Sequence, residues 1–408
     1  MLKHFLSGLF ILLTVVLIAQ SPSGVQAIKM DNGDNFQDLA FLKPLLKNKK
    51  IVLLGESSHG IGDYYALKSR LVKYLHKELG FEVFAIESGI ADVYFEYKKI
   101  DTISAIQLRN NTVYGNFQCT EIMPLFEYIK STAGTAHPLV YAGFDSQNFS
   151  ASFAFLKEVL SSVDKERAEA IINDLSKYYK IPSILWSEDK APLFALGDTI
   201  RRAAEAAMKI IEEHEEPIRI KFGLSDLDMA ILKRAVANHR DAVMLDWQRE
   251  DPVSRRDSLM AANLFWLMET LYPNKKVIIW GHNGHIDKQS PIGNPYKWMG
   301  HYIHEKYKHQ SYHIGLFAKQ GETYEWWTKS IKPFDNDQPD DIEKILSADD
   351  FNIGFLDIAS SMKRKGGKWL NNPVYGFEVE NGGRLGFVPA QRFDGVIVCK
   401  QVKSPSYK

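Results

Sequence analysis

The chain has 408 residues, 45% of them apolar, and its 50 basic side chains balance 50 acidic ones. This balance gives no basic surface for nucleic acid or for an anionic membrane, and it favours a small-molecule partner that is uncharged or weakly charged. The two cysteines, Cys119 and Cys399, are too few for a disulfide scaffold or a cysteine-rich zinc site.

Residues 1–27 have the layout of a secretory signal peptide. The basic residues Lys3 and His4 precede an apolar run from Phe5 to Ala19, and a more polar stretch ends in the small residue Ala27. The apolar run is shorter than the roughly 20 residues that span a bilayer, so we expect cleavage after Ala27 rather than a retained membrane anchor. The mature chain, residues 28–408, is then expected to be secreted or associated with the cell envelope, without stable membrane association.

Six short apolar runs, rich in β-branched residues, predict strands that are buried on both faces. Helical patterns lie between them, for example from Asp63 to Leu79, where Gly80 predicts the helix end. Strands that alternate with helices indicate an α/β fold, with a central, largely parallel sheet flanked by helices. The predicted strands are Ile51–Leu54, Val83–Ile86, Leu139–Ala142, Val277–Trp280, Ile314–Ala318 and Val396–Cys399.

Residues from about 150 to 270 form a different kind of segment. No convincing strand is present, and the composition is rich in Glu, Lys, Ala and Leu, which predicts a long helical insertion between two strands of the sheet. Proline punctuates this segment, for example at Pro192 and Pro252. The later segment 333–378 is rich in Gly, Asp, Asn and Pro and predicts loop with short helices.

Polar side chains follow the first four strands in sequence. The run IVLLGESSHG ends in Glu56 and His59, VFAIESG carries Glu87, and YAGFDSQ carries Asp145. The run VIIWGHNGHI ends in His282 and His285. Because ligands bind beyond the carboxyl ends of parallel strands, these side chains are expected to converge. The alternatives are structural: Glu56 as a helix cap, His59 as a surface residue and Asp145 as an ordinary turn residue.

The usual hydrolase and cofactor motifs are missing from the sequence. It has no G-x-S-x-G nucleophile elbow, no H-E-x-x-H metal motif, no P-loop and no dinucleotide fingerprint. We therefore expect no cofactor. Histidines and carboxylates without an evident nucleophile fit general-base activation of water. They also fit a metal site that is built from His and Glu.

Several ordered stretches resemble the erythromycin esterase family. They are the segment LLGESSHGIGDYYALKSRLVKYLHKELGFEVFAIESG, then YAGFDSQ, RRDSLMAANLFWL and VIIWGHNGHI, with the closing Phe393–Val396 strand. The resemblance covers nearly all of the mature chain and implies one erythromycin esterase-like catalytic domain. It implies a hydrolase that opens a macrolide lactone, or another ester, with activated water and without a metal or a serine nucleophile.

Carried over by position, the resemblance gives each candidate residue a role. His59 is the general base, Glu56 orients it, and Arg256 braces the cleft. The site is completed by Glu87, His282 and His285. We expect Lys68, Asp145 and Asn283 to contact the substrate. Family members often carry arginine where Lys68 stands, and lysine keeps the charge without the bidentate fork.

Two other functions use the same residues. Glu56, His59, His282 and His285 are acceptable ligand types for a metal-dependent hydrolase. The same histidines also suit an exported protein that captures haem or another ligand.

Overall fold

The computed structural model describes residues 24–30, 33–147, 150–181, 184, 192–244, 252–347, 350–379 and 383–407. The predicted leader therefore lies outside the described residues as far as residue 23. Its last residues enter strand β1 (Gln26–Ile28), so the predicted cut after Ala27 falls inside a short strand. No helix in the described residues is long and apolar enough to cross a membrane.

Among the described residues, nine strands form one mixed sheet, and its centre is parallel. The parallel strands lie in the order β11–β6–β2–β5–β3–β4. Each contains all or most of one of the six predicted runs, so the predicted α/β fold with a largely parallel sheet is confirmed. The strands are β2 (Ile51–Leu54), β3 (Val83–Gly89), β4 (Val140–Asp145), β5 (Val277–Trp280), β6 (Ser311–Glu325) and β11 (Gly395–Val402).

The antiparallel strands were not predicted. β8 (Ile353–Asp357) pairs with β11 and with β1, while β7 (Ser330–Asp335) forms a hairpin with β6. β7 is mostly exposed, so it lacks the continuous apolar run that marks a central strand. The prediction of loop with short helices for 333–378 is therefore wrong in part. The segment contains β8 and β9 (Val374–Glu378), and β9 pairs with β10 (Gly383–Phe387).

Helices cover both faces of the sheet because side chains alternate along each strand. Val52 and Leu54 face a core shared with α2 and α5, whereas Ile51 and Leu53 face a core shared with α12 and α14. Gly80 ends α2 with φ of +66°, a left-handed conformation that glycine adopts without strain. These helices are α2 (Gly62–Leu79), α5 (Met123–Thr132), α12 (Pro252–Trp266) and α14 (Met299–Tyr307).

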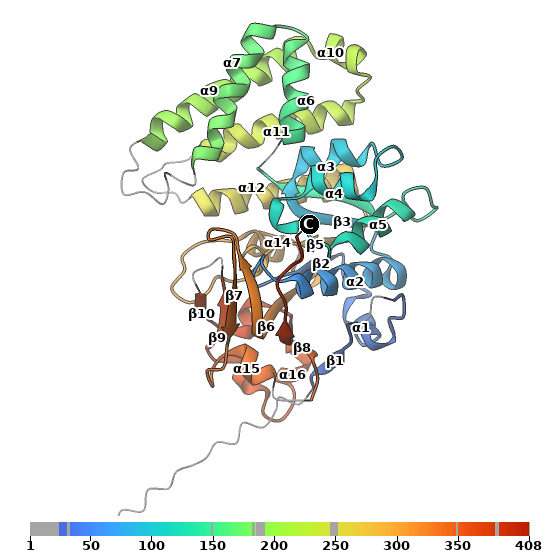
Figure 1. Cartoon of the computed structure of the whole chain (residues 1–408), viewed down its shortest axis with the longest axis vertical. Coiled ribbons are helices and arrows are strands. Elements are labelled where there is room, and N and C mark those ends of the chain that lie inside the picture. Colours follow the sequence, from blue (N-terminus) through green and yellow to red (C-terminus); the bar gives the residue numbers. More distant parts are fainter. Residues whose placement is uncertain are drawn as a thin grey trace, which may run out of the picture.

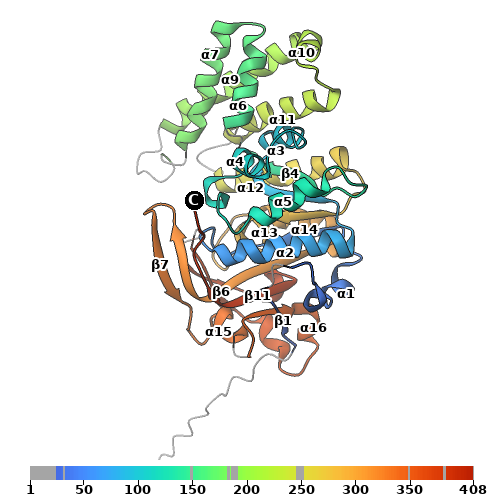
Figure 2. The same cartoon turned by 45° about the vertical axis from the view of Figure 1, so that its right-hand side comes forward.

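Helices are the only regular elements in the described residues between β4 and β5, as predicted. Its helices pack around an apolar core of their own and extend from one end of the molecule, beyond α3 (Figures 1 and 2). Pro192 and Pro252 begin helices, as expected for residues that interrupt helical segments. Between β4 and α12, the described helices are α6 (Ser150–Ser161), α7 (Lys165–Ser176), η3 (Lys177–Lys180), α9 (Pro192–Glu213), α10 (Glu215–Phe222) and α11 (Asp226–Val243).

Short elements complete the fold and carry parts of the candidate site. α13 directly follows β5, and η2 lies between α4 and α5. These elements are η1 (Gln37–Leu39), α1 (Leu42–Leu46), α3 (Ile90–Tyr97), α4 (Ala105–Thr112), η2 (Gly115–Phe117), η4 (Leu267–Leu271), α13 (Asn283–Ile286), η5 (Lys308–Gln310), α15 (Ile342–Leu346), α16 (Ile358–Met362), η6 (Gly367–Asn371) and α17 (Pro389–Arg392).

Candidate active site

The carboxyl ends of β2, β3, β4 and β5 bring the candidate side chains together. β2 leads into the turn with Glu56 and His59, and β3 contains Glu87. Asp145 is the last residue of β4. The parallel register of these four strands places all of these ends at one edge of the sheet, although the residues are far apart in the sequence.

His59 is oriented by Glu56. Nδ1 of His59 lies 2.9 Å from Oε1 of Glu56, which is fully buried. An ionised carboxylate can only accept, so we assign the ring proton to Nδ1, and the lone pair of the neutral ring is then on Nε2. The side chain of His59 keeps 17% of its surface exposed. With this tautomer, Nε2 is the basic nitrogen of the His59 ring.

Glu56 is itself held by buried partners. Nζ of Lys68 lies 2.9 Å from Oε2 of Glu56, and Nε1 of Trp280 donates to the same oxygen at 3.2 Å. The Lys68 ammonium also lies 4.2 Å from the Trp280 ring centroid. Burial lowers the pKa of Lys68 to about 8, against the opposing effect of Glu56. Lys68 is 1% exposed and contacts Glu56, and its predicted contact with a substrate stays a prediction.

Arg256 joins the ends of β3 and β4 from helix α12. Its Nη2 donates to Oε1 of Glu87 at 3.0 Å, and its Nε donates to Oδ1 of Asp145 at 3.1 Å. The hydroxyl of Tyr114 donates to Oδ2 of Asp145 at 2.7 Å. Burial acts to lower the pKa of Arg256, but Asp145 and Glu87 outweigh it and raise that pKa well above its usual value. The bracing role predicted for Arg256 fits these contacts.

His285 forms a second histidine–carboxylate pair. Its Nδ1 lies 2.9 Å from Oδ1 of Asp257, and its Nε2 lies 3.3 Å from Oε1 of Glu87. Burial acts to lower the pKa of His285, but Asp257 and then Glu87 outweigh it and raise the pKa to about 10. His285 is therefore an imidazolium at neutral pH. Burial also acts to raise the pKa of Glu87, but His285, Arg256 and His59 hold it well below its usual value.

His282 lies between the two histidine–carboxylate pairs. Its ring centroid is 5.2 Å from that of His59 and 6.4 Å from that of His285. Nδ1 of His282 accepts from the backbone N–H of Gly284, which is the capping contact of α13. The backbone N–H of His282 donates to Oε2 of Glu87 at 3.1 Å. The turn after β5 is thereby fixed to the end of β3.

Asn283 is engaged by the fold. Its side-chain nitrogen donates to the backbone oxygen of Leu316, and its side-chain oxygen accepts from the backbone N–H of Leu316, both at 3.1 Å. A Cβ atom added at Gly55 would lie 2.1 Å from the same side-chain oxygen. A substrate would have to displace these contacts, so the geometry does not favour the predicted substrate-binding role of Asn283.

Asp257 and Tyr114 were not among the predicted site residues. Asp257 directly follows Arg256 in an apolar helix, and a carboxylate buried there requires a partner. That requirement is the signal that could have identified it. Asp257 also accepts from the backbone N–H of Met299 at 2.8 Å, which fixes α12 against α14. Tyr114 lies in a loop after α4, and no pattern in the sequence marks it.

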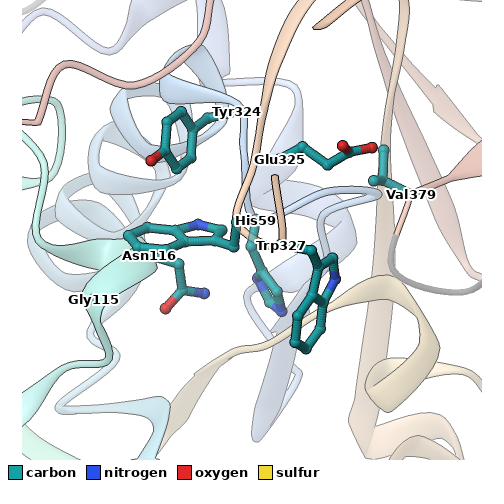
Figure 3. Close-up of a pocket in the computed structure, with 8 residues that line it drawn as sticks. His59, Gly115, Asn116, Tyr324, Glu325, Trp327 and Val379 are labelled. Atoms are coloured by element: carbon teal, nitrogen blue, oxygen red, sulfur yellow. The ribbon is translucent and has the colours of Figure 1, made fainter. Parts of the chain in front are cut away.

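A cavity of about 300 Å³ opens beside His59 (Figure 3). It is lined by segments that are distant in the sequence. The aromatic residues Trp326 and Trp327 were not among the predicted site residues, although two adjacent tryptophans in a polar stretch are a detectable signal. The lining residues are His59, Gly115, Asn116, Tyr324, Glu325, Trp326, Trp327 and Val379.

The predicted metal ligands do not form a metal centre in the described part of the chain. No group of three or more His, Cys, Asp or Glu side chains there could hold a metal ion. Glu56 instead contacts His59 and Lys68, and His285 contacts Asp257 and Glu87.

Comparisons with known proteins give both a sequence family and a fold. A family model described as erythromycin esterase matches residues 76–402. The chain is 29% identical to the putative hydrolase YbfO of Bacillus subtilis (strain 168), over 92% of this chain and 89% of that protein. It is 25% identical to erythromycin esterase type II of Escherichia coli, over 64% of this chain and 65% of that protein. The chain is similar in fold to a solved structure of a mutant of the erythromycin esterase EreC in its open conformation. The TM-score is 0.61 and the identity is 15%, over 90% of this chain and 94% of that one.

The range matched by the family model includes Glu87, Arg256 and His285 but begins after Glu56 and His59. The assignment of these two residues therefore depends on the geometry at the end of β2, where Glu56 orients the His59 ring.

Proposed function

The chain belongs to the erythromycin esterase family and is a hydrolase, and on that premise we propose that it cleaves an ester or lactone with water activated by His59. The observation that carries the proposal is the contact between Nδ1 of His59 and Glu56, because it directs the basic Nε2 away from the carboxylate. The adjoining cavity supplies room for a substrate beside that nitrogen.

The reaction begins with proton transfer from water to Nε2 of His59. The water oxygen forms a bond to the carbonyl carbon, and the carbonyl oxygen takes the negative charge of the tetrahedral intermediate. The carbon–oxygen bond to the alcohol then breaks, and the departing oxygen takes the proton from the His59 imidazolium. In a lactone both products remain on one molecule, so the ring opens. Glu56 stabilises the imidazolium through its carboxylate at 2.9 Å.

The oxyanion is stabilised by positive charge that is already in place. Arg256 is permanently charged, and His285 is an imidazolium whose pKa is about 10. Both cations are held by carboxylates that fix their positions, so little reorganisation is needed as the oxyanion develops.

The substrate of this proposal is a macrolide lactone or another uncharged ester. Its support is the name of the family and of the Escherichia coli relative. The test is to incubate the purified chain with a panel of macrolides, simple lactones and alkyl esters, followed by mass spectrometry. The expected result is product to which one water has been added, formed at least about 100-fold more slowly by His59→Ala. If no compound reacts and haem instead gives an absorption band that His59→Ala removes, the haem-binding alternative is correct.

The proposal also places the mature chain outside the cytoplasmic membrane, secreted or associated with the cell envelope. Its support is the basic, apolar and small-residue order of residues 1–27. N-terminal sequencing of protein recovered from outside the cytoplasmic membrane is expected to begin at Ile28. Recovery only from the cytoplasm, with Met1 intact, would contradict it.

A further inference from the structure

The cavity beside His59 has a wall that the hydrolytic mechanism does not use. The wall consists of the aromatic side chains of Tyr324, Trp326 and Trp327, at and just beyond the end of β6. We propose, on the premise of the proposed function, that this aromatic wall selects esters or lactones whose group beside the carbonyl is an uncharged, apolar ring, with Trp327 as the main determinant.

The aromatic wall is fixed to the turn that carries the proposed base. The backbone N–H of Tyr324 donates to the oxygen of Gly60 at 2.8 Å, and the hydroxyls of Thr323 and Ser58 lie 2.9 Å apart. A Cβ atom added at Gly60 would lie 2.2 Å from the backbone oxygen of Tyr324, so this approach requires glycine. A group that packs against the wall is therefore held at a defined distance from His59.

Two of the wall residues are stabilised by other aromatic rings, whereas Trp327 is open to solvent. The rings of Tyr324 and Trp326 lie 5.1 Å apart, and each packs against Tyr407, at 5.0 and 5.1 Å. Trp327 is 91% exposed, and it lines the same cavity as His59 (Figure 3). An indole buries about 150–250 Å² when it is covered. A ligand whose ring covers part of this surface is therefore expected to bind more tightly than a ligand with a small acyl group.

The charge of the cavity argues against an anionic group. Among the described residues that line it, the only acidic side chain is Glu325, and there is no lysine or arginine. A carboxylate bound there would face Glu325 without a cation to compensate. The ion pairs of Arg256 and Lys68 lie in the catalytic cluster and not in this wall.

The volume of the cavity limits the size of the group. About 300 Å³ is at the lower end of the range of roughly 300–1,000 Å³ for pockets that hold drug-sized ligands. One ring fits, and the rest of a larger substrate would extend past the exposed Trp327. This arrangement accommodates substrates of different size that share a ring beside the scissile bond.

The test uses three esters with the same ethanol leaving group, followed by titration of the released acid. They are ethyl acetate, ethyl cyclohexanecarboxylate and the monoethyl ester of cyclohexane-1,4-dicarboxylic acid. The wild-type chain is expected to prefer the uncharged ring in kcat/KM. Trp327→Ala is expected to reduce the ratio of ring ester to acetate by about 10- to 50-fold, through KM, because covering part of an indole accounts for a change of that size. Trp327→Phe is expected to retain most of the preference.

Ile331→Ala is the matched control, since Ile331 is an exposed apolar residue on the neighbouring strand β7 and does not line the cavity. It is expected to leave the ratio unchanged. The proposal is overturned if Trp327→Ala lowers the rates of both uncharged esters equally, or if the ester with the carboxylate reacts as well as the uncharged ring ester.

A binding measurement separates this proposal from the hydrolytic one. N-ethylcyclohexanecarboxamide, which resists hydrolysis, is titrated calorimetrically into the wild-type chain and into Trp327→Ala. Binding that weakens about 10- to 50-fold in the variant supports the aromatic wall even if no ester is cleaved. Ester cleavage without binding of the amide, and without a ring preference, retains the hydrolytic function and rejects the wall.

Discussion

Oδ1 of Asp257 lies 2.9 Å from Nδ1 of His285, and this contact favours the imidazolium form of the histidine. Burial alone would disfavour the imidazolium, but Asp257 and Glu87 raise the pKa of His285 to about 10. His59 contacts a carboxylate as well, and the two histidines nevertheless have different proposed roles. His59 accepts a proton from water, while His285 supplies fixed positive charge.

Asp257→Asn is expected to lower the pKa of His285 and to shift the alkaline limb of the kcat/KM profile to lower pH. The reason is that the imidazolium loses the carboxylate of Asp257, which raises its pKa more than Glu87 does, so it deprotonates at a lower pH. The measurement is a pH–rate profile for one reactive ester. Asp101→Asn, at an exposed position, serves as the control and is expected to leave the profile unchanged. An alkaline limb that stays in place in Asp257→Asn would remove His285 from the mechanism.

The raised pKa of His285 also predicts how stability changes with pH. The folded chain binds this proton more tightly than the unfolded chain, whose histidine has a pKa of about 6.5. The stabilisation is therefore complete below about pH 6.5 and is lost as the pH rises through about 10. Urea unfolding is expected to show that His285→Gln destabilises the chain more at pH 6 than at pH 10. A loss that is the same at both pH values would contradict the assignment, and exposed His309→Gln provides the baseline.

The buried pair of Glu56 and Lys68 allows stability and activity to be separated. Glu56→Gln leaves the Lys68 ammonium buried without its anion, and breaking such a pair costs roughly 3–5 kcal/mol. Glu56→Gln with Lys68→Met removes both charges, so the double variant is expected to regain stability without regaining activity. Thermal unfolding and kcat/KM are measured on both variants. Full activity in the double variant would show that Glu56 does not assist His59.

Hydrolysis is expected to survive exhaustive treatment with a chelator. The candidate ligands are already engaged, since Glu56 contacts Lys68 and His59, and His285 contacts Asp257. The measurement is kcat/KM before and after dialysis against EDTA, with metal content determined in parallel. Activity that disappears on dialysis and returns with zinc would favour the metal-dependent hydrolase instead.

The parallel centre of the sheet could be predicted from the sequence, whereas its antiparallel edges could not. Strands buried on both faces require continuous apolar runs such as Val277–Trp280, and this requirement is visible in the sequence. β7 is mostly exposed, and the apolar run of β8 is interrupted by Gly354 in a segment rich in Gly and Asp, so neither carries that signal. β8 is defined by its pairing with β1 and β11, and β7 by its hairpin with β6, and no apolar pattern in either strand indicates these partners.

From the residues alone, the candidate site could be predicted where its side chains follow strands, and Arg256 and Lys68, which lie in helices, were added through the family resemblance. Glu87 and His285 were found because strand ends converge, but Asp257 comes from the middle of a helix face and reaches His285 through packing. Trp327 lines the same cavity as His59 because the strand that precedes it, β6, pairs with β2, a contact that the sequence does not reveal. The identity of Lys68 was visible, but its burial behind Glu56 was not.

The central claim is that His59, oriented by Glu56, activates the attacking water. The most direct test is kcat/KM of His59→Ala on a reactive ester, with folding checked by circular dichroism and with His309→Ala as the exposed control. General-base assistance contributes about 10²- to 10⁴-fold, so His59→Ala is expected to lose at least about 100-fold while His309→Ala keeps wild-type activity. A folded His59→Ala that retained more than about a tenth of wild-type kcat/KM would contradict the claim, because such a loss is far below that range.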